Sequence, residues 1–319
     1  MKTLIIGAGG MIGRKLTAQL PKEGLILQDV VPFEGASVVS DLSTPGEAEK
    51  LIATHPELIF HLAAIVSGEA EADFDKGYRV NLDGTRLLFE AIRREGERSA
   101  GAYRPRVVFT SSIAVFGAPF PEAIGDEFLN APLTSYGTQK AIGELLLSDY
   151  SRRGFFDGIG IRLPTICVRP GKPNKAASGF FSGIIREPLA GQEAVLPVPE
   201  TVRHWFASPR AAIGFLLHAA NLDTKKLGNR RNLSMPGISA TVGEQIEALR
   251  KVAGDKVASL IRREPDPTIM RIVEGWPRNF DTRRALELGF RADQSFEEII
   301  RIHIEDELQR SPRHRQAGG

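Results

Sequence analysis

The stretch TLIIGAGGMIG, residues 3–13, decides the fold. Its first four residues form an apolar run that is too short for a helix, and they lead directly into a glycine-rich turn. Glycine lets the backbone turn tightly and approach a ligand, while a helix that follows such a turn presents its N–H groups to phosphate. A structural turn is the alternative, but the order of strand, turn and helix favours a dinucleotide site at Gly7, Gly10, Met11, Ile12 and Gly13.

Similar apolar runs recur along the first half of the chain, and each shows little polar alternation, as strands buried on both faces of a parallel sheet do. These predicted strands are residues 25–30, 58–64, 106–112 and 158–166. Helix-like segments lie between them, at residues 11–20, 47–54, 72–97 and 135–152. Alternating strands and helices predict an α/β fold, a Rossmann-type doubly wound parallel sheet.

The composition of the sequence changes after Pro164, where loops rich in proline, glycine and positive charge begin. An apolar helix at 211–220 and a short strand near 231–235 follow. We therefore predict an NAD-binding Rossmann domain over residues 1–166. Residues 167–319 should form mainly a smaller C-terminal substrate lobe, with some segments that return to the first domain.

Composition indicates a globular protein whose main partner is a small molecule. The 319 residues are 42% hydrophobic and 25% charged, and 41 basic against 39 acidic residues leave a net charge of +2. This charge is too small to favour nucleic acid or a membrane surface as the partner. A single cysteine, Cys167, excludes an internal disulfide and a cysteine-based metal site, so we expect a metal-free protein in a reducing, cytoplasmic compartment.

Asp29 ends the second predicted strand, 22 residues after Gly7, where a carboxylate can accept hydrogen bonds from the adenosine ribose. The same charge repels a 2′-phosphate, and residues 30–32 offer no arginine for one. The pattern favours NAD over NADP, although an ordinary turn aspartate is the alternative. Asp41 and Leu42 fall in a loop suited to the adenine edge.

Tyr136 and Lys140 are four residues apart near the start of a predicted helix, so both lie on one helix face. A phenol has a pKa of about 10, and a neighbouring ammonium group lowers that pKa and makes the phenolate a usable base. The pair alone also occurs by chance on solvated helix faces. Ser112 ends the fourth strand, at the carboxyl edge of the sheet where ligands bind, and its hydroxyl can bind the reacting oxygen.

The third strand ends in HLAA, where Leu62, Ala63 and Ala64 leave room for a flat cofactor. Asn81, in NLDGT on the next helix, is either a packing amide or a support for the site.

Together the motifs GAGGMIG, HLAA, NLDGT, TSSIAVFG, YGTQK and RLPTI resemble the extended short-chain dehydrogenase/reductase family, the NAD-dependent epimerase/dehydratase type. The resemblance covers residues 1–240. It implies that Ser112 polarises the substrate oxygen, that Tyr136 is the acid/base, and that Lys140 both tunes Tyr136 and binds the nicotinamide ribose. It also implies Pro164 and Ile166 beside the cofactor, and a homodimer through the helices at 72–97 and 135–152. The family often has tyrosine where Phe116 stands, which argues against a nucleotide-sugar enzyme of the common kind.

The stretch RLPTICVRPGKPNKAASG, followed later by VRHWF, is similar to family members that oxidise a four-carbon sugar acid. A substrate carboxylate away from water needs a cation, ideally arginine. Arg203 is the favoured partner, since Val202 and Trp205 suggest burial, whereas Arg169, Lys172 and Lys175 are typical of solvated loop charges. Further predicted substrate contacts are Ser67, Ser112, Asn174 and Ser178.

The predicted activity is NAD-dependent oxidation of the C2 hydroxyl of a small sugar acid. Three alternatives stay open: a nucleotide-sugar epimerase or dehydratase, an L-threonine or uronate dehydrogenase, and a non-enzymatic NAD-sensing regulator. The roles of His204 and Trp205, which replace the usual acidic and aromatic residues, are not decided by the pattern.

Overall fold

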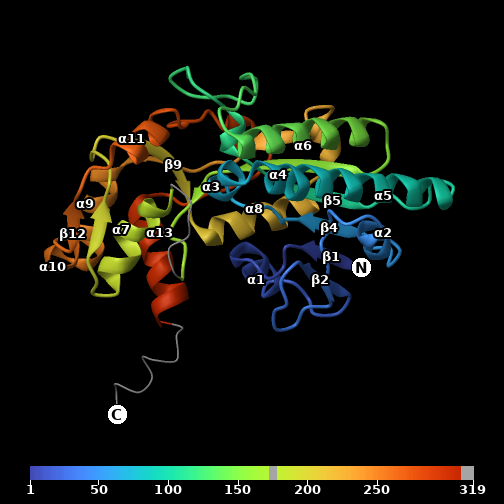
Figure 1. Ribbon diagram of the computed structural model, residues 1–319, viewed down its shortest axis with the longest axis horizontal. Coiled ribbons are helices and arrows are strands. Elements are labelled where there is room, and N and C mark those ends of the chain that lie inside the picture. The colour runs from blue at the N-terminus through green and yellow to red at the C-terminus, as the bar shows by residue number, and fades with distance from the viewer. Residues whose placement is uncertain (172–177, 310–319) are drawn as a thin grey trace, which may run out of the picture.

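The computed structural model describes residues 1–171 and 178–309, and Figure 1 shows its arrangement. A seven-stranded sheet has the order β10-β6-β5-β4-β1-β2-β3, and every neighbouring pair in it is parallel. Its strands are β1 (Thr3–Ile6), β2 (Leu25–Asp29), β3 (Val38–Val39), β4 (Leu58–His61), β5 (Arg106–Ser112), β6 (Asp157–Leu163) and β10 (Asn232–Ser234). The predicted Rossmann-type sheet is confirmed.

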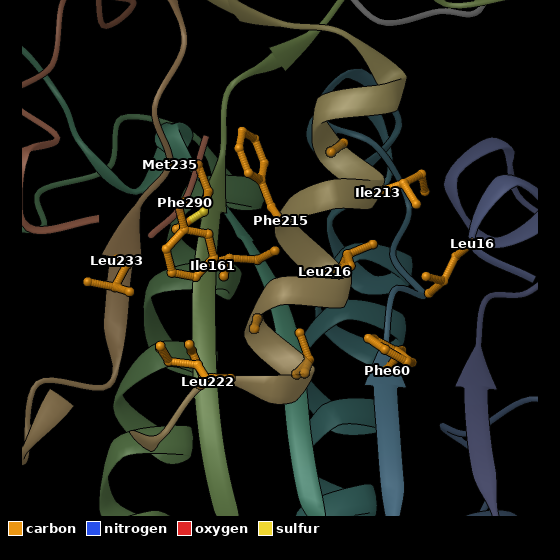
Figure 2. Close-up of a cluster of buried hydrophobic side chains, with 14 of the residues drawn as sticks. Leu16, Phe60, Ile161, Ile213, Phe215, Leu216, Leu222, Leu233, Met235 and Phe290 are labelled. Atoms are coloured by element: carbon orange, nitrogen blue, oxygen red, sulfur yellow. The ribbon is translucent and has the colours of Figure 1, made fainter. Parts of the chain in front are cut away.

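Helices cover both faces of this sheet because alternate residues of its strands point to opposite sides. Ile5 of β1 packs with α1 (Met11–Thr17) and α8 (Pro209–Asn221). Figure 2 shows this side, where Phe215 and Leu216 of α8 lie over the strands. Leu4 and Ile6 face the opposite side, which is covered by α2 (Glu47–Ile52), α5 (Gly84–Arg98) and α6 (Ser135–Arg152).

The segment predicted as one helix over 72–97 is divided into shorter elements. They are α3 (Ser67–Ala72), α4 (Phe74–Gly77), a π-helical segment (Tyr78–Asp83) and α5. A π-helical turn inserts an extra residue per turn and often occurs at a functional site. Here it carries Asn81.

The C-terminal lobe gathers at one end of the sheet, as the orange and red elements of Figure 1 show. Its helices are α7 (Gly179–Leu189), α9 (Val242–Ala253), α10 (Asp255–Ala258), α11 (Pro267–Glu274) and α13 (Phe296–His303), while α12 (Arg283–Glu287) lies beside β10. Its strands are β7 (Thr165–Ile166), β9 (Arg203–Ala207) and β11 (Ile238–Thr241) in one sheet, and β8 (Ala194–Leu196) and β12 (Ile261–Arg263) in another. A separate apolar core, including Phe181, Phe206 and Ile300, holds this lobe together.

The strand order reverses between β1 and β4, because the chain builds outward from β1 on one side and from β4 on the other. In an open α/β sheet this switch point, at the carboxyl ends of the strands, is where ligands bind. Gly7 and Leu62 directly follow these two strands. Within the described ranges, no helix combines the length and the apolar character that a membrane span requires.

A buried ion pair fixes α6 against the sheet. Glu144 of α6 accepts hydrogen bonds from Arg162 of β6 at 2.8 and 2.9 Å, and from the Ser111 hydroxyl of β5 at 2.6 Å. The side chains of Glu144 and Arg162 are only 2% and 6% exposed. The Arg162 guanidinium also lies 4.8 Å from the ring centre of Phe116. Helix α6 is therefore tied to two neighbouring strands at once.

We expect Arg162→Met to lower the free energy of unfolding by about 3–5 kcal/mol, because it leaves Glu144 buried without its charge partner. The exposed pair between Arg152 and Asp149 on the same helix gives a matched control. Arg152→Met should cost less than about 1 kcal/mol. Denaturant unfolding measures both, and equal small losses would show that the buried pair does not fix α6.

Candidate active site

The glycine turn after β1 leaves no space for a side chain. Gly7 has φ +84°, in the region that favours glycine, and a Cβ there would lie 2.7 Å from the Ala63 backbone nitrogen. The turn is therefore pressed against the end of β4, and α1 begins directly after Gly10. The N–H groups of Gly7–Gly10 are bonded within the protein, so the donors that a diphosphate could meet are those of the first turn of α1.

A cleft of about 380 Å³ opens at this turn. The predicted cofactor residues that line it are Gly7, Gly10, Met11, Ile12, Gly13, Leu62 and Ile166. The C-terminal lobe adds Arg169, Ser182 and Arg186 to its lining. Ser182 and Arg186 belong to α7, and nothing in the sequence of that helix beyond an amphipathic pattern could have assigned them to a site.

Asp29 supports the glycine turn from the end of β2. Its carboxylate accepts hydrogen bonds from the Gly9 N–H at 2.9 Å and from the Val31 N–H at 3.2 Å. Asp29 thus stabilises the glycine turn through its carboxylate.

Asp41 is already well partnered, by Ser43 and by Arg79 at 2.7 Å. Partial burial alone would raise the pKa of Asp41, but the bonds from Ser43 and Arg79 hold it below its usual value. Leu42 is buried in the core beside α5.

Asn81 braces the loop that follows β4. Its side chain accepts a hydrogen bond from the Ile65 N–H at 2.9 Å and donates to the Ile65 carbonyl at 3.2 Å. It also donates to Gln139 of α6 at 2.8 Å. Because this loop carries Ala63 and Ala64 and leads to Ser67 at the start of α3, Asn81 links the wall of the cleft to α6.

Ser112, Tyr136 and Lys140 gather where β5 ends and α6 begins. Thr134 caps α6 by accepting a hydrogen bond from the Gly137 N–H at 3.1 Å. A Cβ at Gly137 would lie 2.2 Å from the Ala114 carbonyl oxygen, so only glycine lets this helix start approach the turn after β5 so closely. That approach brings the Ser112 hydroxyl within hydrogen-bonding reach of the Tyr136 phenol.

Lys140 is buried, and its ammonium donates to the Thr110 carbonyl at 2.8 Å while lying 5.8 Å from the ring centre of Tyr136. Burial lowers the pKa of Lys140 to about 8, although the nearby Glu144 carboxylate opposes the shift. Lysine in this position can lose or keep its proton near neutral pH.

Burial raises the pKa of Tyr136 above its ordinary value, and the Ser112 hydrogen bond and the charge of Arg169 act against that rise. The sequence predicted that Lys140 would be the cation that lowers this pKa. In the structure the charge of Arg169 lowers the pKa of the Tyr136 phenol, whereas the Lys140 ammonium donates its hydrogen bond to the Thr110 carbonyl. The spacing of four identifies a shared helix face but not the direction of a long side chain.

The prediction that Arg203 is buried is wrong. Its side chain is 38% exposed, pairs with Glu244 at 3.2 Å and donates to the Ser239 carbonyl at 3.1 Å. It lines a different cavity, of about 620 Å³, together with Ser239, Arg278 and Asn279. Arg203 begins strand β9, where Glu244 can reach it from α9, and its apolar sequence neighbours give no information about this contact.

The remaining predicted contacts are placed as follows. Pro164 is buried between β6 and β7, and Ser178 lies partly buried just before α7. Asn174, with Lys172 and Lys175, lies outside the described residues. Among the residues that are described, no three His, Cys, Asp or Glu side chains are grouped to hold a metal ion.

His204 and Trp205 are both packed inside the protein. His204 hydrogen-bonds the Thr165 hydroxyl at 2.6 Å and stacks on Phe181 with ring centres 5.2 Å apart. Burial lowers the pKa of His204 to about 4. The Trp205 indole donates to the Met235 carbonyl at 3.1 Å, so both residues hold β9 in place.

Sequence comparison finds close relatives along the whole chain. A model of the NAD dependent epimerase/dehydratase family matches residues 3–232. Two relatives named D-erythronate dehydrogenase, from Cupriavidus necator and Haemophilus influenzae, are 48% and 42% identical to this chain. The alignments cover 96% and 97% of this chain and 98% and 100% of those relatives.

Solved structures of related proteins have the same fold as this chain. One described as a nucleoside-diphosphate-sugar epimerase from Agrobacterium tumefaciens is 68% identical, with a TM-score of 0.93 over 98% of this chain and 95% of that one. An L-threonine dehydrogenase from Clostridium difficile, 23% identical with a TM-score of 0.84 over 95% and 96% of the two chains, shares the fold. With a family match over most of its length and relatives aligned from end to end, the chain belongs to the NAD dependent epimerase/dehydratase family.

Proposed function

We propose that this chain is an NAD-dependent dehydrogenase that oxidises the C2 hydroxyl of D-erythronate, giving 2-dehydro-D-erythronate. The observation that carries the proposal is the end-to-end alignment with two D-erythronate dehydrogenases. The gathering of Ser112, Tyr136 and Lys140 at the strand ends supports it, since a hydroxyl, a phenol and an ammonium group are what alcohol oxidation needs.

In this proposal Tyr136, as phenolate, takes the proton of the C2 hydroxyl, and the Ser112 hydroxyl donates a hydrogen bond to the same oxygen. The C2–H bond breaks as the C2–O bond becomes double, and NAD, when bound, supplies the acceptor for that hydride. The charge of Arg169 favours the phenolate. Lys140 stays beside Tyr136, bonded to the Thr110 carbonyl, and its remaining N–H groups would meet the cofactor ribose. Positioned proton transfer of this kind contributes about 10²–10⁴-fold in rate.

The cleft fits a dinucleotide on physical grounds. Glycine at position 7 lets the turn lie against the end of β4, and the lining of the cleft leads from this turn to Leu62 and Ile166. Asp29 would receive the adenosine ribose, Asp41 and Leu42 the adenine side, and Asn81 would hold the loop that borders the nicotinamide half. This placement favours NAD over NADP because a 2′-phosphate would face the Asp29 carboxylate.

A nucleotide-sugar epimerase is the second candidate, and the name of the 68% identical Agrobacterium tumefaciens structure favours it. Such an enzyme would keep its cofactor bound and would return the hydride within one turnover. A dehydrogenase instead releases NADH, so the two activities differ in an observable product.

To test the function, D-erythronate, L-threonine, a uronate and UDP-glucose should each be mixed with NAD and followed by NADH absorbance. We expect NADH to accumulate with D-erythronate, at a kcat/KM at least about tenfold above the others, since a polar site rejects substrates that leave its groups unpaired. The proposal fails if D-erythronate gives no NADH. Conversion of UDP-glucose without free NADH would instead support the epimerase.

Asp29→Asn tests the cofactor assignment, because the amide oxygen can still accept from Gly9 while the charge is lost. The wild type should prefer NAD over NADP by about tenfold or more in kcat/KM, equal to about 1.4 kcal/mol. The variant should have a smaller ratio, mainly because its kcat/KM with NADP rises. Equal constants for the two cofactors in the wild type would contradict the role given to Asp29.

A further inference from the structure

The described charged side chains that line the cleft beside the glycine turn are all positive. Among its described lining residues are two arginines, Arg169 and Arg186, and no carboxylate. One part of the lining is the backbone of the glycine turn, and the other comes from the C-terminal lobe. A cavity with this lining suits a small dianion better than a neutral group.

Arg169 is held in place by three hydrogen bonds. Its backbone N–H donates to the Ser182 hydroxyl at 3.0 Å, and its carbonyl accepts from Arg186 at 2.6 Å. Its side-chain Nε donates to the Ile166 carbonyl at 3.1 Å. The guanidinium group therefore projects from a backbone that α7 fixes on both sides.

Arg186 has a different task. Its side chain is only 14% exposed, and it pairs with Glu187 as well as with the Arg169 carbonyl. Much of its charge is thus already compensated within α7. Arg186 and Ser182 position Arg169, which leaves Arg169 as the cation through which the lobe acts on the cleft.

We propose that Arg169 binds the diphosphate of the dinucleotide from the C-terminal lobe, opposite the glycine turn, with Ser182 and Arg186 as positioning residues. The proposal rests on the NAD-dependent function proposed above. The bound cofactor then joins the two parts of the protein, because its diphosphate is held by the sheet domain and by the lobe together. Arginine suits this task, since its planar group gives two parallel hydrogen bonds to phosphate oxygens.

The carboxylate of the sugar acid is the competing occupant, because Arg169 is also near enough to Tyr136 for its charge to act on the phenol. The diphosphate is favoured because Arg169 shares its cavity with Gly7, Gly10 and Gly13, where the diphosphate of the cofactor belongs. The two occupants make opposite predictions for ligands that lack a sugar acid.

Calorimetric titration with ADP-ribose and with adenosine, without any sugar acid, separates them. ADP-ribose has the diphosphate, whereas adenosine keeps only the base and one ribose. Arg169→Met should weaken ADP-ribose binding about 10- to 100-fold, as expected for loss of a charged hydrogen-bonding group, and should leave adenosine binding within about twofold. The exposed Arg152→Met serves as the matched control and should change neither affinity.

Two further variants and an unfolding measurement distinguish loss of the phosphate contact from misfolding. Arg169→Lys keeps the charge without the planar group and should give an intermediate loss, while Ser182→Ala should give a smaller one. Thermal unfolding of each free variant shows that it is folded.

Unchanged ADP-ribose affinity in folded Arg169→Met overturns the proposal, as does weakened D-erythronate binding to the NADH complex without any change for ADP-ribose. If the wild-type protein did not bind ADP-ribose, the proposed cofactor site itself would be contradicted. A wild type that binds ADP-ribose but does not oxidise D-erythronate would contradict only the substrate assignment.

Discussion

The buried ion pair between Glu144 and Arg162 is the interaction on which the site depends. It joins α6 to β6, and the Ser111 hydroxyl extends it to β5, one residue before Ser112. Loss of either charge would leave the other buried without its partner, so the pair strongly disfavours other placements of the helix. One turn before Glu144, the same helix carries Lys140, and its first turn carries Tyr136. The placement of these proposed catalytic side chains thus depends on a contact in the core.

Two basic side chains lie near Tyr136 and come from different parts of the molecule. Lys140 belongs to the sheet domain and is fixed to the Thr110 carbonyl, whereas Arg169 comes from the lobe and is fixed by α7. Burial alone would make Tyr136 a poor base, since it raises the phenol pKa. The lobe therefore contributes to the electrostatics of Tyr136, the proposed proton carrier, as well as to the lining of the cleft.

Much of the fold could be predicted from the sequence because its signals are local. The apolar runs and the glycine turn mark the parallel strands, and 135–152 matches α6 residue for residue. What could not be predicted depends on tertiary contacts. The direction of the Lys140 side chain, the pairing of Arg203 with Glu244, and the place of Ser182 and Arg186 beside the cleft all involve partners distant in sequence. Likewise the π-helical turn that carries Asn81 has no local signature in NLDGT.

The central claim, that Tyr136 accepts the substrate proton, is tested most directly by the pH dependence of kcat/KM for D-erythronate oxidation. Because the phenol must lose its proton to act and burial raises its pKa, activity should rise with pH from neutrality into the alkaline range. In Tyr136→Phe the rate should fall by about 10²–10⁴-fold and the rising limb should disappear. Tyr150→Phe, on the same helix with its hydroxyl bonded to Glu90, should behave like the wild type. A Tyr136→Phe enzyme with near-normal rates and an unchanged pH profile would contradict the account.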